Sequence, residues 1–155
     1  MAALHTSEHT RTVPLADPAA TEALAAEISA GLVPGDAIAL TGDLGAGKTV
    51  FARALIVALG KAAGIDYGHV PSPTFTLVQL YDLPGFTVYH FDLYRLTSPD
   101  DVWETGIEDA FADGVSVIEW ADRIEGLLPP RAIRVHLAFG DGEPARIATV
   151  TETGS

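Results

Sequence analysis

The chain contains no cysteine among its 155 residues. This absence excludes disulfide bonds and thiolate metal sites, and it suits a reducing compartment such as the cytosol. No apolar run approaches the roughly 20 residues that are needed to cross a bilayer. Residues 1–11 also lack a basic stretch followed by an apolar one, so we expect no secretory signal. These absences together predict a cytoplasmic protein without a membrane segment.

Basic residues are scarce in this sequence. The chain has 9 lysines and arginines against 21 aspartates and glutamates, which gives a formal net charge of −12. Binding to nucleic acid depends on Lys and Arg side chains that neutralise phosphates, and no basic cluster occurs along the chain. We therefore expect any nucleic acid that matters to the function to be held by a partner protein.

The residues that are present describe one globular domain. Apolar residues make up 48% of the chain and charged residues 19%, which are the proportions of a folded protein and not of a disordered one. A chain of this length fits one domain and buries about 68–70% of the surface that it exposes when unfolded. We expect a single domain over residues 1–155, with residues 1–10 flexible.

Apolar runs between turn residues indicate alternating helices and strands. Asp17 and Pro18 are typical of a helix start, because aspartate caps the first turn and proline fits its first position. The expected strands are 11–15, 36–40, 74–81, 86–93, 115–120, 131–139 and 145–151, and the expected helices begin near residues 17, 48, 98 and 107. This alternation predicts an α/β fold with a central mixed sheet, parallel in its centre and antiparallel at its flanks.

Residues 42–49 match the pattern G-x-x-x-x-G-K-[ST] in full, between an expected strand and an expected helix. Such a loop cradles phosphates with its backbone N–H groups, while the lysine reaches the β- and γ-phosphates and the hydroxyl takes one Mg²⁺ position. An incidental glycine-rich turn is disfavoured, because the chain has only two lysines and one falls on the motif. The motif predicts a P-loop NTPase-type three-layer fold and a nucleotide-binding set: Gly42, Asp43, Leu44, Gly45, Ala46, Gly47, Lys48 and Thr49.

A Mg-nucleotide site also needs a carboxylate at the end of a neighbouring strand. Three acids fulfil this condition: Asp82, Asp92 and Glu119. Asp82 lies in a tight connection with Pro84 and Gly85, so capping of a turn is its most economical role. Asp92 and Glu119 follow apolar strands that can lie beside the strand before the loop, and we favour these two.

Asparagine is absent from the chain. Ras-like GTPases read guanine through an Asn-Lys-x-Asp motif, which this sequence cannot contain. A GTPase of that class is therefore disfavoured, and we expect ATP to bind in preference to GTP.

Five segments together give the chain a family resemblance. They are GDLGAGKT at 42–49, SPTFTLV at 72–78, YHFDLYRL at 89–96, GIED at 106–109 and VIEW at 117–120. In this order and spacing they resemble the TsaE (YjeE) family of bacterial P-loop ATPases. The resemblance runs from about residue 13 to residue 146. It implies an ATPase that is slow alone and that supports threonylcarbamoyladenosine modification of tRNA by acting on a TsaD–TsaB complex, with tRNA involved only indirectly.

The resemblance also implies roles for particular residues. Thr49 and Glu119 correspond to the family's Mg²⁺ ligands, and Asp92 to its essential acid near the γ-phosphate. With Lys48, Asp92 and Glu119 form the expected catalytic set. Trp120 corresponds to an aromatic beside the site. The segment 72–74 lies where the family has a mobile, switch-like segment, and Ala121 replaces a frequent proline.

Two other functions stay open at this point. A P-loop kinase for a small metabolite usually has an arginine-rich lid, whereas only Arg131 and Arg134 lie close together here. A nucleotide-dependent binding module with negligible turnover is the other alternative. Of the remaining residues, His90 is more typical of a packed strand histidine than of a base. Arg95 is expected to contact phosphate, a partner or one of the many acids.

Overall fold

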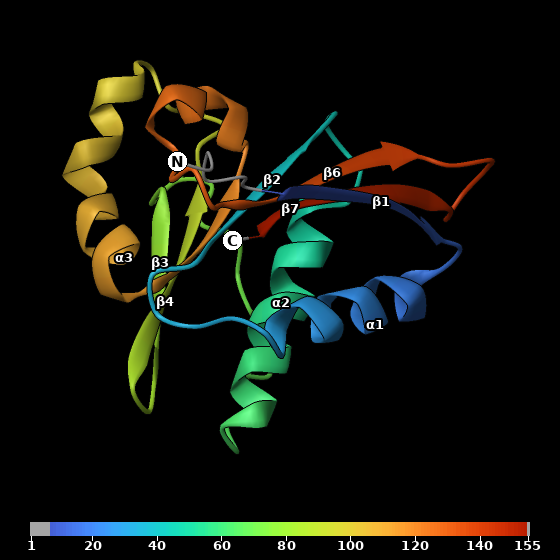
Figure 1. Ribbon diagram of the computed structural model, residues 1–155, viewed down its shortest axis with the longest axis horizontal. Helices are drawn as coiled ribbons and strands as arrows, with labels where there is room; N and C mark the ends of the chain where they lie inside the picture. Colours follow the sequence, from blue (N-terminus) through green and yellow to red (C-terminus); the bar gives the residue numbers. More distant parts are fainter. Residues whose placement is uncertain (1–6, 155) are drawn as a thin grey trace, which may run out of the picture.

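The computed structural model describes residues 7–154, which form one seven-stranded sheet with helices on both faces (Figure 1). The strand order is β1-β7-β6-β2-β5-β4-β3. The strands are β1 Ser7–Leu15, β2 Ala37–Gly42, β3 Val78–Leu83, β4 Phe86–Asp92, β5 Val115–Glu119, β6 Ile133–Phe139 and β7 Arg146–Gly154. The α-helices are α1 Pro18–Ser29, α2 Lys48–Ala62 and α3 Ile107–Asp113, and the 3₁₀-helices are η1 Pro99–Thr105 and η2 Ala121–Leu127.

The centre of the sheet is parallel and its flanks are antiparallel. Strand β2 pairs in parallel with β5 and β6, and β4 pairs in parallel with β5. Antiparallel pairs join β3 to β4, β6 to β7 and β1 to β7. The predicted mixed sheet and three-layer α/β fold are therefore confirmed. No helix in the described part of the chain is both long and apolar enough to span a bilayer.

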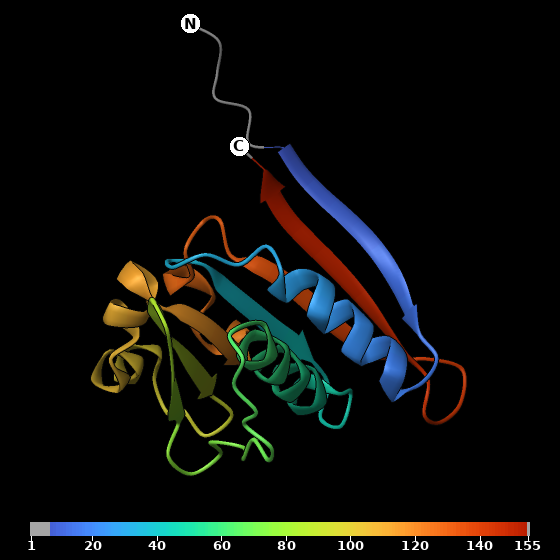
Figure 2. The same ribbon diagram turned by 90° about the horizontal axis from the view of Figure 1, so that it is seen from below.

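Successive side chains of the central strands point to opposite faces of the sheet and form an apolar layer on each face. Ile38 and Leu40 of β2 pack with α1 and α2, which lie side by side on one face of the sheet (Figure 2). Ala39 between them packs on the opposite face, with α3, η1 and η2. A strand buried on both faces reads as a continuous apolar run, which is why DAIAL was recognisable in the sequence.

The N-terminal strand is longer than expected. Strand β1 begins at Ser7 rather than Arg11, and its register with β7 runs from Ser7 opposite Gly154 to Leu15 opposite Arg146. Residues 7–10, which were expected to be flexible, pair with β7 in this structure, and residues 1–6 lie outside the described part of the chain. The start of β1 is polar, so backbone pairing to β7 defines it and no hydrophobic pattern marks it.

Several other strand boundaries also differ from the prediction by one to four residues. Strand β3 begins at Val78 rather than at residue 74, because Leu77 adopts a left-handed backbone with φ of 69°. Strand β4 ends at Asp92 and β5 at Glu119, one residue earlier than expected in each case. The two acids are therefore the last residues of their strands.

Candidate functional site

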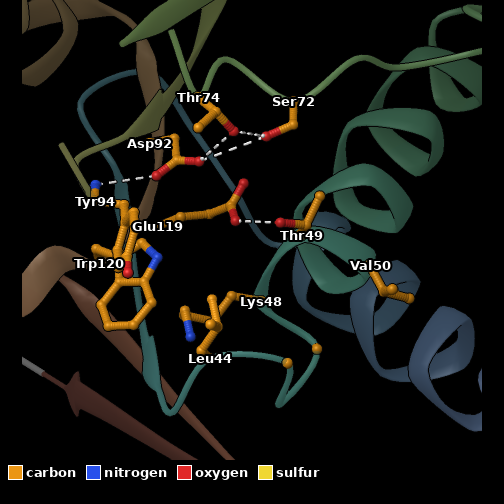
Figure 3. Close-up of a pocket in the computed structure, with 12 residues that line it drawn as sticks. Leu44, Lys48, Thr49, Val50, Ser72, Thr74, Asp92, Tyr94, Glu119 and Trp120 are labelled. Carbon is orange, nitrogen blue, oxygen red and sulfur yellow. Dashed lines mark hydrogen bonds between the residues drawn. The ribbon is translucent and has the colours of Figure 1, made fainter.

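The carboxyl ends of three parallel strands meet at one edge of the sheet. In the register, Leu40 of β2 lies opposite Glu119 of β5, and Glu119 lies opposite Asp92 of β4. Helix α2 begins at Lys48, six residues after the end of β2 at Gly42. A cavity of about 360 Å³ opens at this edge (Figure 3). Ligands of open α/β sheets bind in this position, outside the carboxyl ends of the strands.

The glycines of residues 42–49 permit a turn that other residues would resist. Gly42, Gly45 and Gly47 have φ values of 140°, 83° and 110°. A Cβ atom on Gly42 would lie 2.3 Å from the backbone oxygen of Leu137, which faces it on β6. Gly47 caps α2 without a side-chain hydrogen bond, so backbone N–H groups at the helix start remain for a ligand. The strand–loop–helix geometry that the motif requires is therefore present.

Lys48 lies inside the loop and is only 4% exposed. Its Nζ atom donates to the backbone oxygens of Gly42 at 2.6 Å and Asp43 at 2.9 Å. It also lies 4.0 Å from the ring centroid of Trp120. Burial lowers the pKa of the Lys48 ammonium from its usual value, and nearby acids, Glu119 first among them, oppose this effect. The ammonium is thus held at the loop with few water contacts, where its attraction for an anion is strong.

Glu119 connects the loop to the centre of the sheet. Its Oε1 atom accepts a hydrogen bond from the Thr49 hydroxyl at 2.5 Å, and its Oε2 atom lies 2.7 Å from Nε2 of His90. The residue is 1% exposed. A hydroxyl and a carboxylate side by side offer the hard oxygen ligands that Mg²⁺ prefers, with room left for water and phosphate oxygens. Thr49 and Glu119 therefore fit the metal position that the sequence predicts for them.

Asp92 is held by three donors and is 5% exposed. Its Oδ2 atom accepts from the Thr74 hydroxyl at 3.2 Å and lies 3.5 Å from that of Ser72, while Oδ1 accepts from the Tyr94 backbone at 3.1 Å (Figure 3). The segment before β3 is thereby attached to the site through an acid at the end of β4. The hydroxyls and the backbone N–H stabilise the carboxylate at the cavity wall.

Trp120 also lines the cavity, in an uncommon backbone conformation. It follows β5 directly with a φ of 59°, in the left-handed region that non-glycine residues rarely adopt. Its ring lies over Lys48 and packs against Tyr94 at a centroid distance of 4.8 Å. Strain of this kind, at roughly 1–3 kcal/mol, persists where surrounding contacts fix the residue.

The structure brings most of the predicted site residues together. Lys48, Thr49, Asp92, Glu119 and Trp120 all line the one cavity, with Leu44, Gly45 and Gly47 of the loop. Gly42 and Asp43 contribute backbone oxygens to Lys48, and Ala46 is buried beneath the loop. Asp82 is remote from the cavity: it is exposed in the β3–β4 hairpin and accepts a hydrogen bond from Thr87.

Sequence reasoning missed several contributors to the site. His90 contacts Glu119, and its spacing of two from Asp92 is the signal that places both on one face of β4. The contacts of Ser72 and Thr74 with Asp92 depend on the path of the segment before β3, for which no pattern exists. Arg95 stacks on Phe75 at 4.5 Å, an interaction that was not among its expected ones.

A second cavity of about 180 Å³ adjoins the outer side of the loop. It is lined by loop residues 45–47 together with Pro18, Val50 and Arg146. The Arg146 side chain donates to the backbone oxygen of Gly45 at 3.2 Å and lies over the ring of Phe139. The lining of this cavity is mainly apolar, with Asp17, Thr21 and Arg146 as its polar side chains.

Comparisons with a family model and with individual proteins all point to the same family. The family model described as "Threonylcarbamoyl adenosine biosynthesis protein TsaE" matches residues 15–147. The tRNA threonylcarbamoyladenosine biosynthesis protein TsaE of Rickettsia felis is 41% identical over 135 residues, which cover 87% of this chain and 76% of that protein. The protein of the same name from Bacillus subtilis is 34% identical over 140 residues, 90% of this chain and 84% of the relative.

A solved structure shows the same architecture. The crystal structure of Bacillus subtilis YdiB superposes with a TM-score of 0.72 at 29% sequence identity, covering 97% of this chain and 90% of that one. The matched family model spans most of the chain and includes every residue of the candidate site. The chain therefore belongs to the TsaE family of threonylcarbamoyl adenosine biosynthesis proteins.

Proposed function

We propose that the protein binds ATP with Mg²⁺, hydrolyses it slowly, and thereby supports threonylcarbamoyladenosine modification of tRNA through a TsaD–TsaB complex in the cytoplasm. One observation carries the nucleotide part of this proposal. The Thr49 hydroxyl and the Glu119 carboxylate meet at the N-terminus of α2, beside a glycine-rich loop that holds a buried lysine. Membership of the TsaE family supports the proposed role in tRNA modification.

Each residue has a defined task in this proposal. The backbone of the loop and Lys48 bind the phosphates, because N–H groups and an ammonium with few water contacts attract anions strongly. Thr49 and Glu119 hold Mg²⁺, which neutralises charge on the phosphate oxygens when it is bound. Asp92 orients the attacking water or water bound to the metal. The second cavity, with Val50 and Arg146, takes the adenine.

The contacts of Asp92 suggest why turnover is slow without a partner. Two of its three donors, Ser72 and Thr74, come from one segment, so the position of the carboxylate depends on that segment. A partner that moves the segment changes how Asp92 faces the phosphates. Hydrolysis then responds to the TsaD–TsaB complex, which is the regulation that the proposal requires.

A kinase of small metabolites is less well supported. A second phosphorylated substrate needs a cluster of arginines as a clamp. Arg134 pairs instead with Glu125 at 2.7 Å and Arg146 with Glu143 at 3.1 Å. A binding module without turnover differs from the proposal only in the rate of phosphate release.

The test is to reconstitute tRNA modification with purified TsaD and TsaB, with and without this protein and ATP. We expect modification and phosphate release to require both the protein and ATP. A matched control uses the Lys48→Ala variant, which removes the proposed phosphate contact and whose folding is checked by thermal unfolding. Nucleotide binding without phosphate release, in the presence of both partners, would support the binding module instead. Modification that proceeds equally well without this protein would reject the biosynthetic role.

A further inference from the structure

The imidazole of His90 is completely buried in β4 and contacts only one charged group of the site. Its exposure is 0%, and its Nε2 atom lies 2.7 Å from Oε2 of Glu119. Because carboxylate oxygens are hydrogen-bond acceptors, we assign the hydrogen of this contact to Nε2. The strand register puts His90 opposite Val117, two residues before Glu119 on the same face of β5. The ring therefore reaches the carboxylate diagonally across the β4–β5 pair.

The two oxygens of Glu119 have separate partners. Oε1 accepts from the Thr49 hydroxyl on α2, whereas Oε2 accepts from His90 on β4. Thr49 and Glu119 line the cavity where the metal is proposed to bind, and their hydrogen bond is visible there (Figure 3). His90 does not line that cavity and contacts Oε2 from a fully buried position on β4. A contact that is engaged from the interior stays in place when the cavity fills. The carboxylate can then present one oxygen outward without turning.

We propose that His90 is a positioning residue that fixes the orientation of the Glu119 carboxylate for Mg²⁺ at the nucleotide site. This inference rests on the proposed Mg-ATP function and deepens it. Ligands of metal ions are commonly oriented by hydrogen bonds from a second layer of residues, and loss of such a bond typically costs about 10–100-fold in metal affinity or activity. His90 takes that place for Glu119.

The surroundings of His90 argue against a purely packing role. Its neighbours on the same face of β4 and β5 include Val88 and Val117, which belong to the apolar layer under α2. An aliphatic side chain would suit this layer, because a buried polar group costs free energy unless it is hydrogen-bonded. The bond to Glu119 is the one hydrogen bond of the His90 side chain among residues 7–154. The carboxylate accounts for a histidine at this position.

Three variants separate a hydrogen bond from packing: His90→Gln, His90→Asn and His90→Leu. The amide nitrogen of Gln extends about as far from the main chain as Nε2 of His, whereas that of Asn ends near the position of Nδ1. Gln thus keeps an N–H donor within reach of Glu119. Asn is polar but too short to reach the Glu119 carboxylate, and Leu fills a similar volume without any donor. A packing role predicts no advantage for Gln over Leu.

The measurement is the affinity for a fluorescent ATP analogue. It is determined at a series of Mg²⁺ concentrations and, separately, in EDTA without free Mg²⁺. For His90→Leu and His90→Asn we expect the Mg²⁺ concentration at half effect to rise about 10–100-fold. We expect His90→Gln to stay close to the wild type, and all variants to bind alike in EDTA, where Lys48 and the loop carry the affinity. Thermal unfolding without nucleotide identifies any variant that is not folded.

The outcomes distinguish this inference from the function on which it rests. A wild type that binds no ATP, or binds it equally in EDTA, overturns the proposed function and this role with it. A wild type that depends on Mg²⁺ together with an unchanged His90→Leu overturns only the role of His90. So does a His90→Gln variant that fails as badly as His90→Leu. In a Glu119→Ala background, His90→Leu should have no further effect on Mg²⁺ dependence, and an additive effect would contradict the proposal.

Discussion

Two acids ten residues apart show how differently two regions of the sheet use a carboxylate. Asp92 ends β4, is 5% exposed and has three hydrogen-bond donors. Asp82 lies in the β3–β4 hairpin and is exposed, and its carboxylate accepts a hydrogen bond from the Thr87 hydroxyl at 3.0 Å. Strand β4 runs parallel to β5, so Asp92 lies beside Glu119, whereas β3 runs antiparallel and carries Asp82 toward the opposite edge. Strand direction, not residue type, decides which acid belongs to the candidate site.

The largest expected effect is on turnover at the parallel edge. Replacing Asp92 by Ala should lower kcat by about 10²–10⁴-fold, the contribution typical of a group that assists proton transfer. ATP affinity should fall much less, because a group that acts mainly on the transition state affects kcat more than binding. Phosphate release with TsaD and TsaB present measures the first effect and calorimetry the second. Normal turnover in a folded Asp92→Ala variant would contradict the assignment.

The second comparison concerns stability and uses one glycine from each region. Gly42→Ala should lower the free energy of unfolding by about 2–5 kcal/mol. Alanine resists the positive φ at this position, and its Cβ atom would be forced against the backbone oxygen of Leu137. Gly85→Ala in the hairpin should cost only about 1–2 kcal/mol, because nothing lies within 4 Å and the backbone term acts alone. Urea unfolding of both variants provides the test. Equal losses would show that the contact with β6 relaxes without cost.

A smaller effect is expected for phosphate binding. Lys48→Ala removes a charge-assisted contact worth about 1.5–3 kcal/mol, so ATP should bind about 10–150-fold more weakly. Calorimetry with Mg-ATP measures this change. Lys61, the other lysine, lies in the last turn of α2 and away from the cavity. Lys61→Ala is therefore the matched control, and an equal loss in that variant would point to a general charge effect.

The smallest effect is expected at the hairpin acid. Asp82→Ala should change stability by less than about 0.5 kcal/mol, as is usual for exposed positions, and should leave turnover unchanged. The same phosphate-release assay that is used for Asp92→Ala tests this expectation. A strong loss of activity in Asp82→Ala, together with a nearly normal Asp92→Ala, would reverse the comparison between the two acids.

Residues fixed by a local pattern were predictable from the sequence. The loop at 42–49 has a complete motif, and Asp92 and Glu119 each end a recognisable apolar strand. Features that depend on long-range pairing were not predictable. The polar start of β1 is set by β7, which lies at the other end of the chain. The hydroxyls of Ser72 and Thr74 reach Asp92 from a segment that precedes the left-handed turn at Leu77, and no local pattern marks either feature.

The position of Trp120 has a spectroscopic consequence. The chain has only two tryptophans, and the ring of Trp120 lies 4.0 Å from the Lys48 ammonium on the cavity wall. Indole emission responds to a nearby charge, so any movement of Lys48 toward phosphate alters the fluorescence of Trp120. Trp103, in η1, supplies the background signal. A Trp103→Phe chain therefore carries a single tryptophan, at the site, with which arrival of the proposed nucleotide can be followed in real time and without a label.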